Sequence, residues 1–239
     1  MPVEQPSSAL LQELVAANRV LYAQKIVDGL GHVSVRHDKN PNLYVLAAER
    51  APGLVSRKDL AIYDLDSNAQ TLRDRRPYNE RFIHGEIYKA RPDVQSIVHC
   101  HTPSLIPFAV CTQVDLKPLY HMSGFLGRGV ARYDIREFGG MTNLLVSTPK
   151  LGKSLAQSLG DKEIVLMRGH GATMVGETVR HSVYRAIYAA LNAAMQTDAM
   201  RMGEVTYLAP EEAELGRDVN DRFNQRSWDL WKLEALKGA

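Results

Sequence analysis

The stretch Ser96–Pro103, SIVHCHTP, places two histidines one residue apart at the end of a short apolar run. Such a run is typical of a buried strand. Because alternate side chains of a strand point to the same face, His99 and His101 should converge while Cys100 points away. Two converging imidazoles form half of a binding site for a divalent metal ion. The stretch therefore predicts a strand that ends in a metal half-site.

The composition predicts a single domain over residues 1–239, with a helical tail from about residue 204. The chain has 239 residues, of which 45% are hydrophobic, and this is enough for a substantial core. No glycine-, serine- or proline-rich linker and no internal repeat divides it. Its two cysteines do not form a disulfide framework, so we expect a protein of the reducing cytoplasm.

Charge and hydropathy argue against two classes of partner. The formal net charge is +2 with both signs interspersed and no long basic stripe, so we expect no nucleic-acid partner. No apolar run approaches the ~20 residues that span a bilayer, and the polar N-terminus lacks the features of a signal peptide. We therefore expect no membrane partner. With both classes of partner disfavoured, an enzyme is a reasonable expectation.

Hydrophobic periodicity in the rest of the chain predicts a layered domain. It predicts helices over residues 9–27, 81–90, 149–159, 178–202 and 210–236. It predicts further strands over residues 32–36, 43–46, 61–66, 143–147 and 163–167. Phe223, Trp228 and Trp231 are the expected packing anchors of the last helix. Because helices and strands mix without strict alternation, we expect an α/β or α+β fold with a largely antiparallel sheet.

His170 is the candidate for a third metal ligand. It lies between two glycines just after the strand predicted over 163–167, where a lone histidine is as often a simple turn residue. Beside His99 and His101 it completes a set of three imidazoles, which leaves a coordination position open for substrate or water. A structural zinc site would instead have four ligands, usually including closely spaced cysteines, and neither cysteine here has such a partner. An open catalytic site is favoured.

Glu80 is the candidate acid/base. It lies four residues before His84, so both side chains can reach one helix face. Taken alone, it is equally well read as a solvated glutamate at a helix N-terminus, where a negative charge is mildly stabilising.

Three spaced motifs resemble the class II aldolase/adducin family: ERFIHGEIYKARPDV at 80–94, VHCHTP at 98–103 and RGHG at 168–171. The similarity runs from about residue 11 to residue 202. The resemblance implies a three-layer α/β/α fold with a nine-stranded antiparallel sheet. It also implies a homotetramer with its active sites at subunit interfaces.

The resemblance assigns roles to four residues. It implies that His99, His101 and His170 ligate a divalent metal ion, and that Glu80 is the catalytic acid/base and can also approach the metal. Adducin-like relatives without enzymatic activity lack the metal-binding histidines, whereas this chain keeps all three. An enzyme is therefore favoured over an interaction module.

Departures from the family pattern argue against a phosphorylated sugar. The family's sugar-phosphate aldolases and epimerases hold phosphate with a Gly-Asn pair, a Thr-x-Ser-Gly-like turn and a Ser-Ser pair. The corresponding stretches here read GH at 31–32, AERAPG at 48–53 and YN at 78–79. The replacements add His32 and Arg50. Arg50 suits a planar carboxylate, which an arginine can hold with two hydrogen bonds, although it is equally well read as a surface arginine.

Local similarity narrows the expected reaction. GHVSVR at 31–36, RAP at 50–52 and HMSGFLG at 121–127 look most like the family's aromatic-acid decarboxylases, which act on hydroxymethylpyridine dicarboxylate or dihydroxyphthalate. This implies a metal-dependent decarboxylase of a hydroxylated aromatic or heteroaromatic (di)carboxylate. The expected substrate-binding residues are His32, Arg36 and Arg50. His121 and Tyr133 either assist Glu80 in catalysis or merely pack and hydrogen-bond.

The expected chemistry needs one divalent metal ion and no organic cofactor. Glu80 would deliver a proton to the ring carbon that bears the carboxylate, which calls for a raised pKa in a partly dry pocket. Manganese is favoured for a substrate that chelates through two oxygens, and zinc or cobalt would also suit three imidazoles. The alternative is a metal-dependent aldolase or epimerase acting on a small hydroxy-carbonyl compound or sugar phosphate. A non-enzymatic interaction module is the third possibility on fold alone.

Overall fold

A seven-stranded sheet forms the middle of the computed structural model, which describes residues 3–72 and 75–237. The strand order is β3-β2-β1-β4-β7-β6-β5. Neighbouring strands run antiparallel except β5 and β6, so the prediction of a mainly antiparallel sheet is confirmed. The described residues form seven strands rather than the nine that the family resemblance implies. The strands are β1 (His32–Arg36), β2 (Leu43–Ala47), β3 (Leu60–Asp64), β4 (Ser96–Cys100), β5 (Ala131–Tyr133), β6 (Ile164–Met167) and β7 (Gly171–Gly176).

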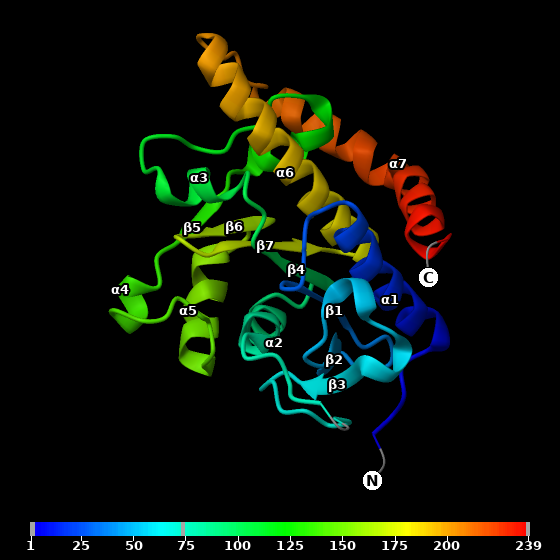
Figure 1. Ribbon diagram of the computed structural model, residues 1–239. Coiled ribbons are helices and arrows are strands. Elements are labelled where there is room, and N and C mark those ends of the chain that lie inside the picture. Colours follow the sequence, from blue (N-terminus) through cyan, green and yellow to red (C-terminus); the bar gives the residue numbers. More distant parts are fainter. Residues whose placement is uncertain (1–2, 73–74, 238–239) are drawn as a thin grey trace.

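Helices cover both faces of this sheet (Figure 1). One face carries α1 (Ser8–Ala23), α3 (Ile106–Val110), α6 (Val179–Met202) and α7 (Pro210–Lys237), and the other carries α2 (Arg81–Ala90) and α5 (Pro149–Leu159). Each face has its own apolar core. The predicted three-layer α/β/α fold is therefore confirmed. The remaining short helices are α4 (Arg136–Gly139) and the 3-10 turns η1 (Pro52–Leu54), η2 (Arg57–Asp59) and η3 (His121–Arg128).

Strand β4 lies in the centre of the sheet and alternates between the two cores. Val98 and Cys100 pack in the core beneath α1 and α6, whereas Ile97 belongs to the core beneath α2 and α5. The period of two then places His99 on the α2 side and Cys100 on the other, which is the alternation that the sequence predicts. His99 pairs with His32 of β1 on one side and with Thr173 of β7 on the other.

The strand predicted over residues 143–147 is wrong, because this segment is a loop. Leu144 has a φ of +69°, a left-handed conformation that is incompatible with a strand. The Leu144 N–H donates to Thr142 Oγ1 at 3.0 Å, and the Leu145 N–H donates to Asn143 Oδ1 at 3.2 Å. These polar side chains satisfy backbone groups that a neighbouring strand would otherwise bond.

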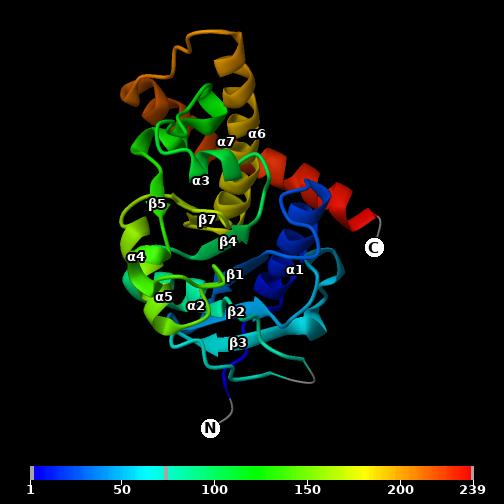
Figure 2. The ribbon, with the colours of Figure 1, turned by 60° about the vertical axis from the view of Figure 1, so that its left-hand side comes forward.

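Helix α7 forms the C-terminal tail and crosses α6 towards α1 (Figure 2). Trp228 and Trp231 are 1% and 9% exposed and pack in the core as predicted. Phe223 is 59% exposed, so the prediction that it anchors the tail is wrong within this chain. The last two residues of the predicted tail, 238 and 239, lie outside the described residues. Among the helices described, none is both long and apolar enough to cross a membrane.

Candidate metal centre

Three histidines and one glutamate converge beside the end of the central strand. His99 lies in β4 and His101 follows it, Glu80 is the N-cap residue of α2, and His170 lies in the turn between β6 and β7. One ligand atom from each of the four residues lies within 4.8 Å of the other three. The Nε2 atoms of His99 and His170 are each 3.1 Å from His101 Nε2. The structure therefore brings the three predicted metal ligands together with the predicted acid/base.

Two glycines beside His170 explain why the chain turns at this point. Gly169 has a φ of +66°, which glycine adopts without the steric cost of a side chain. A Cβ atom on Gly171 would lie 2.1 Å from the carbonyl oxygen of Cys100, so only glycine allows β7 to begin this close to β4. The RGHG motif is thus what the turn needs to bring His170 to the end of β4.

The hydrogen bonds of the histidines leave ring nitrogens that suit a metal ion. His170 donates from Nδ1 to the Leu144 carbonyl oxygen at 2.9 Å, so its Nε2 keeps a lone pair that faces His101. His99 Nδ1 lies 3.2 Å from Thr173 Oγ1. Metal–nitrogen bonds of about 2.0–2.1 Å place neighbouring ligand nitrogens about 3.0–3.4 Å apart. The 3.1 Å separations match this range, so the residues present fit a divalent metal ion.

Glu80 is buried beside the histidines and is held by the loop that follows α4. Its Oε1 accepts a hydrogen bond from the Val146 N–H at 2.9 Å, and its Oε2 lies 3.4 Å from His170 Nε2 and 3.6 Å from His99 Nε2. Burial alone would raise the pKa of Glu80, but the neighbouring His170 and His99 and the hydrogen bond from the Val146 N–H outweigh it and lower this pKa to about 2. The expectation of a raised pKa is therefore wrong, and Glu80 is ionised at neutral pH.

A cavity of about 290 Å³ opens at the cluster and is close to the lower limit of size for small-molecule sites. The predicted residues His32, Arg50, Glu80 and His101 all contribute to its wall. The Tyr78 hydroxyl donates to the Arg50 carbonyl oxygen and so fixes the backbone of that loop. The other lining residues are Gly29, Leu30, Gly31, Glu49, Ala51, Tyr78, Asn79 and Leu145.

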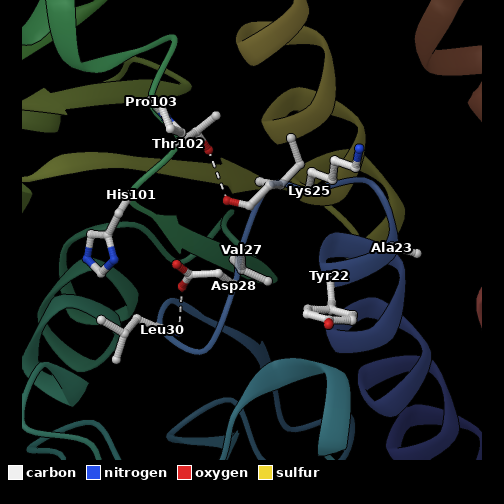
Figure 3. Close-up of a pocket in the computed structure, with 10 residues that line it drawn as sticks. Tyr22, Ala23, Lys25, Val27, Asp28, Leu30, His101, Thr102 and Pro103 are labelled. Atoms are coloured by element: carbon white, nitrogen blue, oxygen red, sulfur yellow. Dashed lines mark hydrogen bonds between the residues drawn. The ribbon is translucent and has the colours of Figure 1, made fainter.

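A second cavity, of about 500 Å³, lies against His101 and is shown in Figure 3. The Thr102 hydroxyl donates to the Ile26 carbonyl oxygen at 3.0 Å and ties the end of β4 to the segment after α1. Asp28 Oδ1 accepts from the Leu30 N–H at 2.8 Å and closes the turn that faces His101. Leu30 and His101 contribute to both cavities, so this turn forms part of the wall of the metal centre.

Three predicted site residues are not among those that line the cavity at the cluster. The buried Arg36 guanidinium donates to four main-chain carbonyl oxygens, those of Pro41, Tyr88, Arg91 and Val94. The Tyr133 hydroxyl lies 3.1 Å from Ser154 Oγ and 3.4 Å from the Leu151 carbonyl oxygen. His121 is exposed at the start of η3, and its carbonyl oxygen accepts from Asn220 Nδ2 at 2.8 Å.

Sequence reasoning missed two backbone groups of the site. The Leu144 carbonyl and the Val146 N–H hold His170 and Glu80, and no sequence signal marks them because any residue type carries these groups. His84 was expected on one helix face with Glu80, but it points to the sheet and hydrogen-bonds to His32 at 2.7 Å. One sequence signal could have placed His84. The strand predicted over residues 32–36 has alternate residues on one face, and His32 lies on the face that His84 contacts.

The fold and the cluster define a three-layer α/β/α protein with a candidate divalent-metal centre at the end of its central strand. The chain belongs to the class II aldolase and adducin family, because residues 12–197 match the family described as "Class II Aldolase and Adducin N-terminal domain". The crystal structure of an aldolase II superfamily protein from Pseudomonas syringae has the same fold. Its TM-score is 0.81 at 19% identity, over 99% of this chain and 96% of that one.

Two curated relatives are decarboxylases. The chain is 35% identical to "Decarboxylase tropJ" of Talaromyces stipitatus, over 98% of this chain and 96% of the relative. It is 27% identical to a "3,4-dihydroxyphthalate decarboxylase" of Arthrobacter keyseri, over 95% of this chain and 92% of the relative. These relatives confirm the prediction of an enzyme, a carbon–carbon lyase of the decarboxylase type.

Proposed function

We propose that the protein decarboxylates a hydroxylated aromatic or heteroaromatic carboxylate at the cavity beside Glu80. The observation that carries this proposal is the composition of that cavity: His101 and Glu80 of the candidate metal cluster line it together with Arg50 and His32. The name of the Arthrobacter keyseri relative specifies a dihydroxylated aromatic dicarboxylate, which supports the same class of substrate.

Arg50 and His32 are the proposed substrate-binding residues. Arg50 lines the cavity, and its Nε donates to the Leu54 carbonyl oxygen at 3.3 Å. A guanidinium can hold a carboxylate with two parallel hydrogen bonds. His32 lies beside the Tyr78 ring, with ring centroids 5.0 Å apart and ring planes tilted by 34°, so an aromatic substrate would meet aromatic side chains there. These features suit a planar acid better than a flexible phosphorylated sugar.

Glu80 is the proposed acid/base, and its low pKa supports an order of proton transfers in which the carboxylate acts first as a base. Because it is ionised at neutral pH, it first accepts the proton of the substrate's ring hydroxyl. It then returns this proton to the ring carbon that bears the carboxylate. The bond from that carbon to the carboxylate breaks, its electron pair restores the aromatic ring, and CO₂ leaves. The product is a phenolate, which takes up a proton from water.

His99, His101 and His170 are the residues that would hold the metal ion. When bound, the ion supplies Lewis-acid chemistry by drawing electron density from the substrate's oxygens. Manganese is our first choice because carboxylate and phenolate oxygens suit it as well as imidazole does, with zinc and cobalt as the alternatives.

The assembly and the compartment belong to the same proposal. We expect a homo-oligomer, a tetramer by family resemblance, in the cytoplasm. Cys100 and Cys111 are both free thiols, one buried and one exposed, which suits a reducing compartment.

A substrate panel tests the proposed reaction. Manganese-loaded protein is incubated with 2-hydroxybenzoate-type and dihydroxyphthalate-type acids, and CO₂ release is measured. Sugar phosphates are tested in parallel for aldehyde release, which the alternative aldolase activity predicts. We expect CO₂ from at least one ortho-hydroxy acid and none after the metal is removed by a chelator. Aldehyde release from a sugar phosphate, with no CO₂ from any of the acids, would overturn the proposal.

A further inference from the structure

A chain of buried hydrogen bonds runs from the cavity wall into the core. His32 Nδ1 lies 2.7 Å from His84 Nε2, His84 Nδ1 lies 2.6 Å from Ser34 Oγ, and Ser34 Oγ lies 2.8 Å from the Tyr88 hydroxyl. All four residues are buried.

The sequence spacing of these residues explains how they meet. His32 and Ser34 are two apart on strand β1, so they share one face of the sheet. His84 and Tyr88 are four apart on helix α2, so they share one face of the helix. The strand pair and the helix pair face each other in the core beneath α2.

Each contact in this chain holds one hydrogen atom between two polar atoms, so the whole chain points one way or the other. In the first direction Tyr88 donates to Ser34, Ser34 donates to His84 Nδ1, and His84 Nε2–H donates to His32 Nδ1. In the reverse direction each of these donors becomes an acceptor. The two directions leave His32 with opposite tautomers, since its Nδ1 is an acceptor in the first and a donor in the second.

Tyr88 selects the first direction. Its hydroxyl has Ser34 Oγ as its one hydrogen-bond partner among the described residues, and the side chain is 1% exposed. In the reverse direction the Tyr88 hydroxyl would accept from Ser34, and its own hydrogen would be buried without a partner, which costs free energy. Burial also raises the pKa of Tyr88, so the hydroxyl keeps its hydrogen.

His32 then carries its hydrogen on Nε2. No hydrogen bond to His32 Nε2 is formed within residues 3–72 and 75–237, and His32 lines the cavity. We propose that Tyr88, Ser34 and His84 form a relay that fixes His32 as the Nε2–H tautomer, so that His32 donates a hydrogen bond to an anionic oxygen of the substrate. The oxygen belongs to a carboxylate or a phenolate, and this part of the inference rests on the proposed function.

The relay makes His32 selective. A neutral imidazole in free exchange between tautomers can present either a donor or an acceptor, whereas a fixed Nε2–H favours substrates with an acceptor oxygen. His84 is therefore a positioning residue: it acts through His32 and does not line the cavity at the cluster.

The tautomer is measured directly and without substrate. The ¹⁵N spectrum of histidine-labelled protein, loaded with Zn²⁺ because this ion is diamagnetic, reports which ring nitrogen carries the hydrogen. The His32 signals are assigned by their loss in His32→Asn. We expect a protonated Nε2 and an unprotonated Nδ1 on His32 of the unmodified chain. A protonated Nδ1 would overturn the relay, whatever reaction the protein catalyses.

Tyr88→Phe tests whether Tyr88 sets the direction of the hydrogen-bond chain, with Tyr44→Phe as its control. Both tyrosines lie in the core beneath α2, and the Tyr44 hydroxyl bonds Ser67 and the Arg81 carbonyl instead of the relay. We expect mixed His32 tautomers in Tyr88→Phe and a single one in Tyr44→Phe. The same single tautomer in both variants would contradict the assignment of Tyr88.

Substitution of His84 tests the effect on binding. Glutamine can still accept from Ser34 and donate to His32, whereas methionine can do neither. We expect His84→Met to raise KM for the acid about tenfold with a smaller change in kcat and an unchanged metal content. His84→Gln should restore most of the affinity. An equal KM for His84→Met and the unmodified protein would overturn the positioning role, and absence of any decarboxylation would overturn the proposed function while leaving the tautomer result intact.

Discussion

The Nδ1–H of His170 donates to the carbonyl oxygen of Leu144 at 2.9 Å, although 26 residues separate the two in the chain. Two residues after Leu144, the Val146 N–H donates to Glu80. The loop over residues 143–147 therefore orients both a candidate metal ligand and the proposed acid/base. Its hydrogen bonds fix the tautomer of His170, and metal-binding histidines need such partners on the ring nitrogen that faces away from the ion.

Substitution of His170 by asparagine separates the role of His170 in metal binding from its hydrogen bond to the loop over residues 143–147. Asparagine can still donate to Leu144 but has no atom in the place of Nε2. We expect metal content to fall well below that of the unmodified protein, while the metal-free forms of both unfold at similar urea concentrations. Elemental analysis after dialysis measures the metal, and His121→Asn is the matched control, because His121 is an exposed histidine outside the cluster. Full metal content in His170→Asn would refute the ligand assignment.

Arg50 should determine affinity for the substrate's carboxylate. Hydrogen bonds to charged groups contribute about 1.5–3 kcal/mol, so we expect Arg50→Met to raise KM by about 10- to 100-fold. The KM of Arg50→Lys should lie between those of the unmodified protein and Arg50→Met, because lysine keeps the charge but lacks the paired donors. Arg57→Met is the control, since Arg57 is exposed on η2 and does not line the cavity. Steady-state kinetics with equal KM values for Arg50→Met and Arg57→Met would exclude this role.

Burial of His84 should make stability depend on pH. Burial lowers the pKa of His84 to about 3, from 6.5 in an unfolded chain. Between these values the unfolded chain binds one more proton, so the free energy of unfolding falls as the pH decreases below 6.5, by about 1.4 kcal/mol per pH unit for one such group. Above pH 6.5 His84 is neutral in both the folded and the unfolded chain, so the free energy of unfolding no longer changes with pH through this group.

Urea unfolding of the metal-free protein between pH 5 and pH 7 measures this dependence. The range avoids Glu80, whose pKa of about 2 affects stability only as the pH falls below about 4.5. We expect a shallower slope in His84→Gln than in the control His121→Gln. Identical slopes would mean that His84 is not buried as a neutral imidazole.

Trp228 should hold the tail on the domain. It is 1% exposed, and its indole Nε1–H donates to Glu13 Oε1 of α1 at 3.3 Å. Replacing a buried tryptophan by alanine costs about 3–5 kcal/mol, whereas an exposed substitution stays within about 0.5 kcal/mol. We therefore expect Trp228→Ala to destabilise the protein strongly and Phe223→Ala to have little effect. Equal losses in urea unfolding would mean that α7 packs through Phe223 instead.

Elements with strong periodicity could be predicted from the sequence. Helices α2 and α5 follow their apolar spacing, and in β4 His99 and Cys100 face opposite sides of the sheet because strands alternate. The three candidate metal ligands could be proposed because the His-x-His pair and the RGHG turn both lie at strand ends. Here local pattern and global fold agree.

The loop over residues 143–147 and the charge of Glu80 could not be predicted. NLLVS reads as a strand, but the side chains of Thr142 and Asn143 bond the backbone and Leu144 turns left-handed. The low pKa of Glu80 depends on histidines from β4 and from the turn after β6, and no local pattern contains this arrangement.

Arg36 shows a different limit of sequence reasoning. The GHVSVR motif at residues 31–36 resembles the family's aromatic-acid decarboxylases and so predicts Arg36 as a substrate-binding residue. Arg36 lies at the other end of β1 from His32, however, where it donates to carbonyl oxygens at the C-terminal end of α2, among them those of Tyr88 and Arg91. The position of Arg36 along β1 therefore determines which groups it contacts.

The most direct test of the proposed reaction is the release of ¹³CO₂ from an ortho-hydroxy aromatic acid labelled in its carboxyl group. Manganese-loaded unmodified protein and Glu80→Gln are compared, with metal content measured in both. Loss of a positioned acid/base typically costs about 10²- to 10⁴-fold in rate, so we expect rapid release from the unmodified protein and a loss of this size in Glu80→Gln at equal metal content. Equal ¹³CO₂ release from both proteins would contradict the role of Glu80, and no release from either would contradict the proposed function.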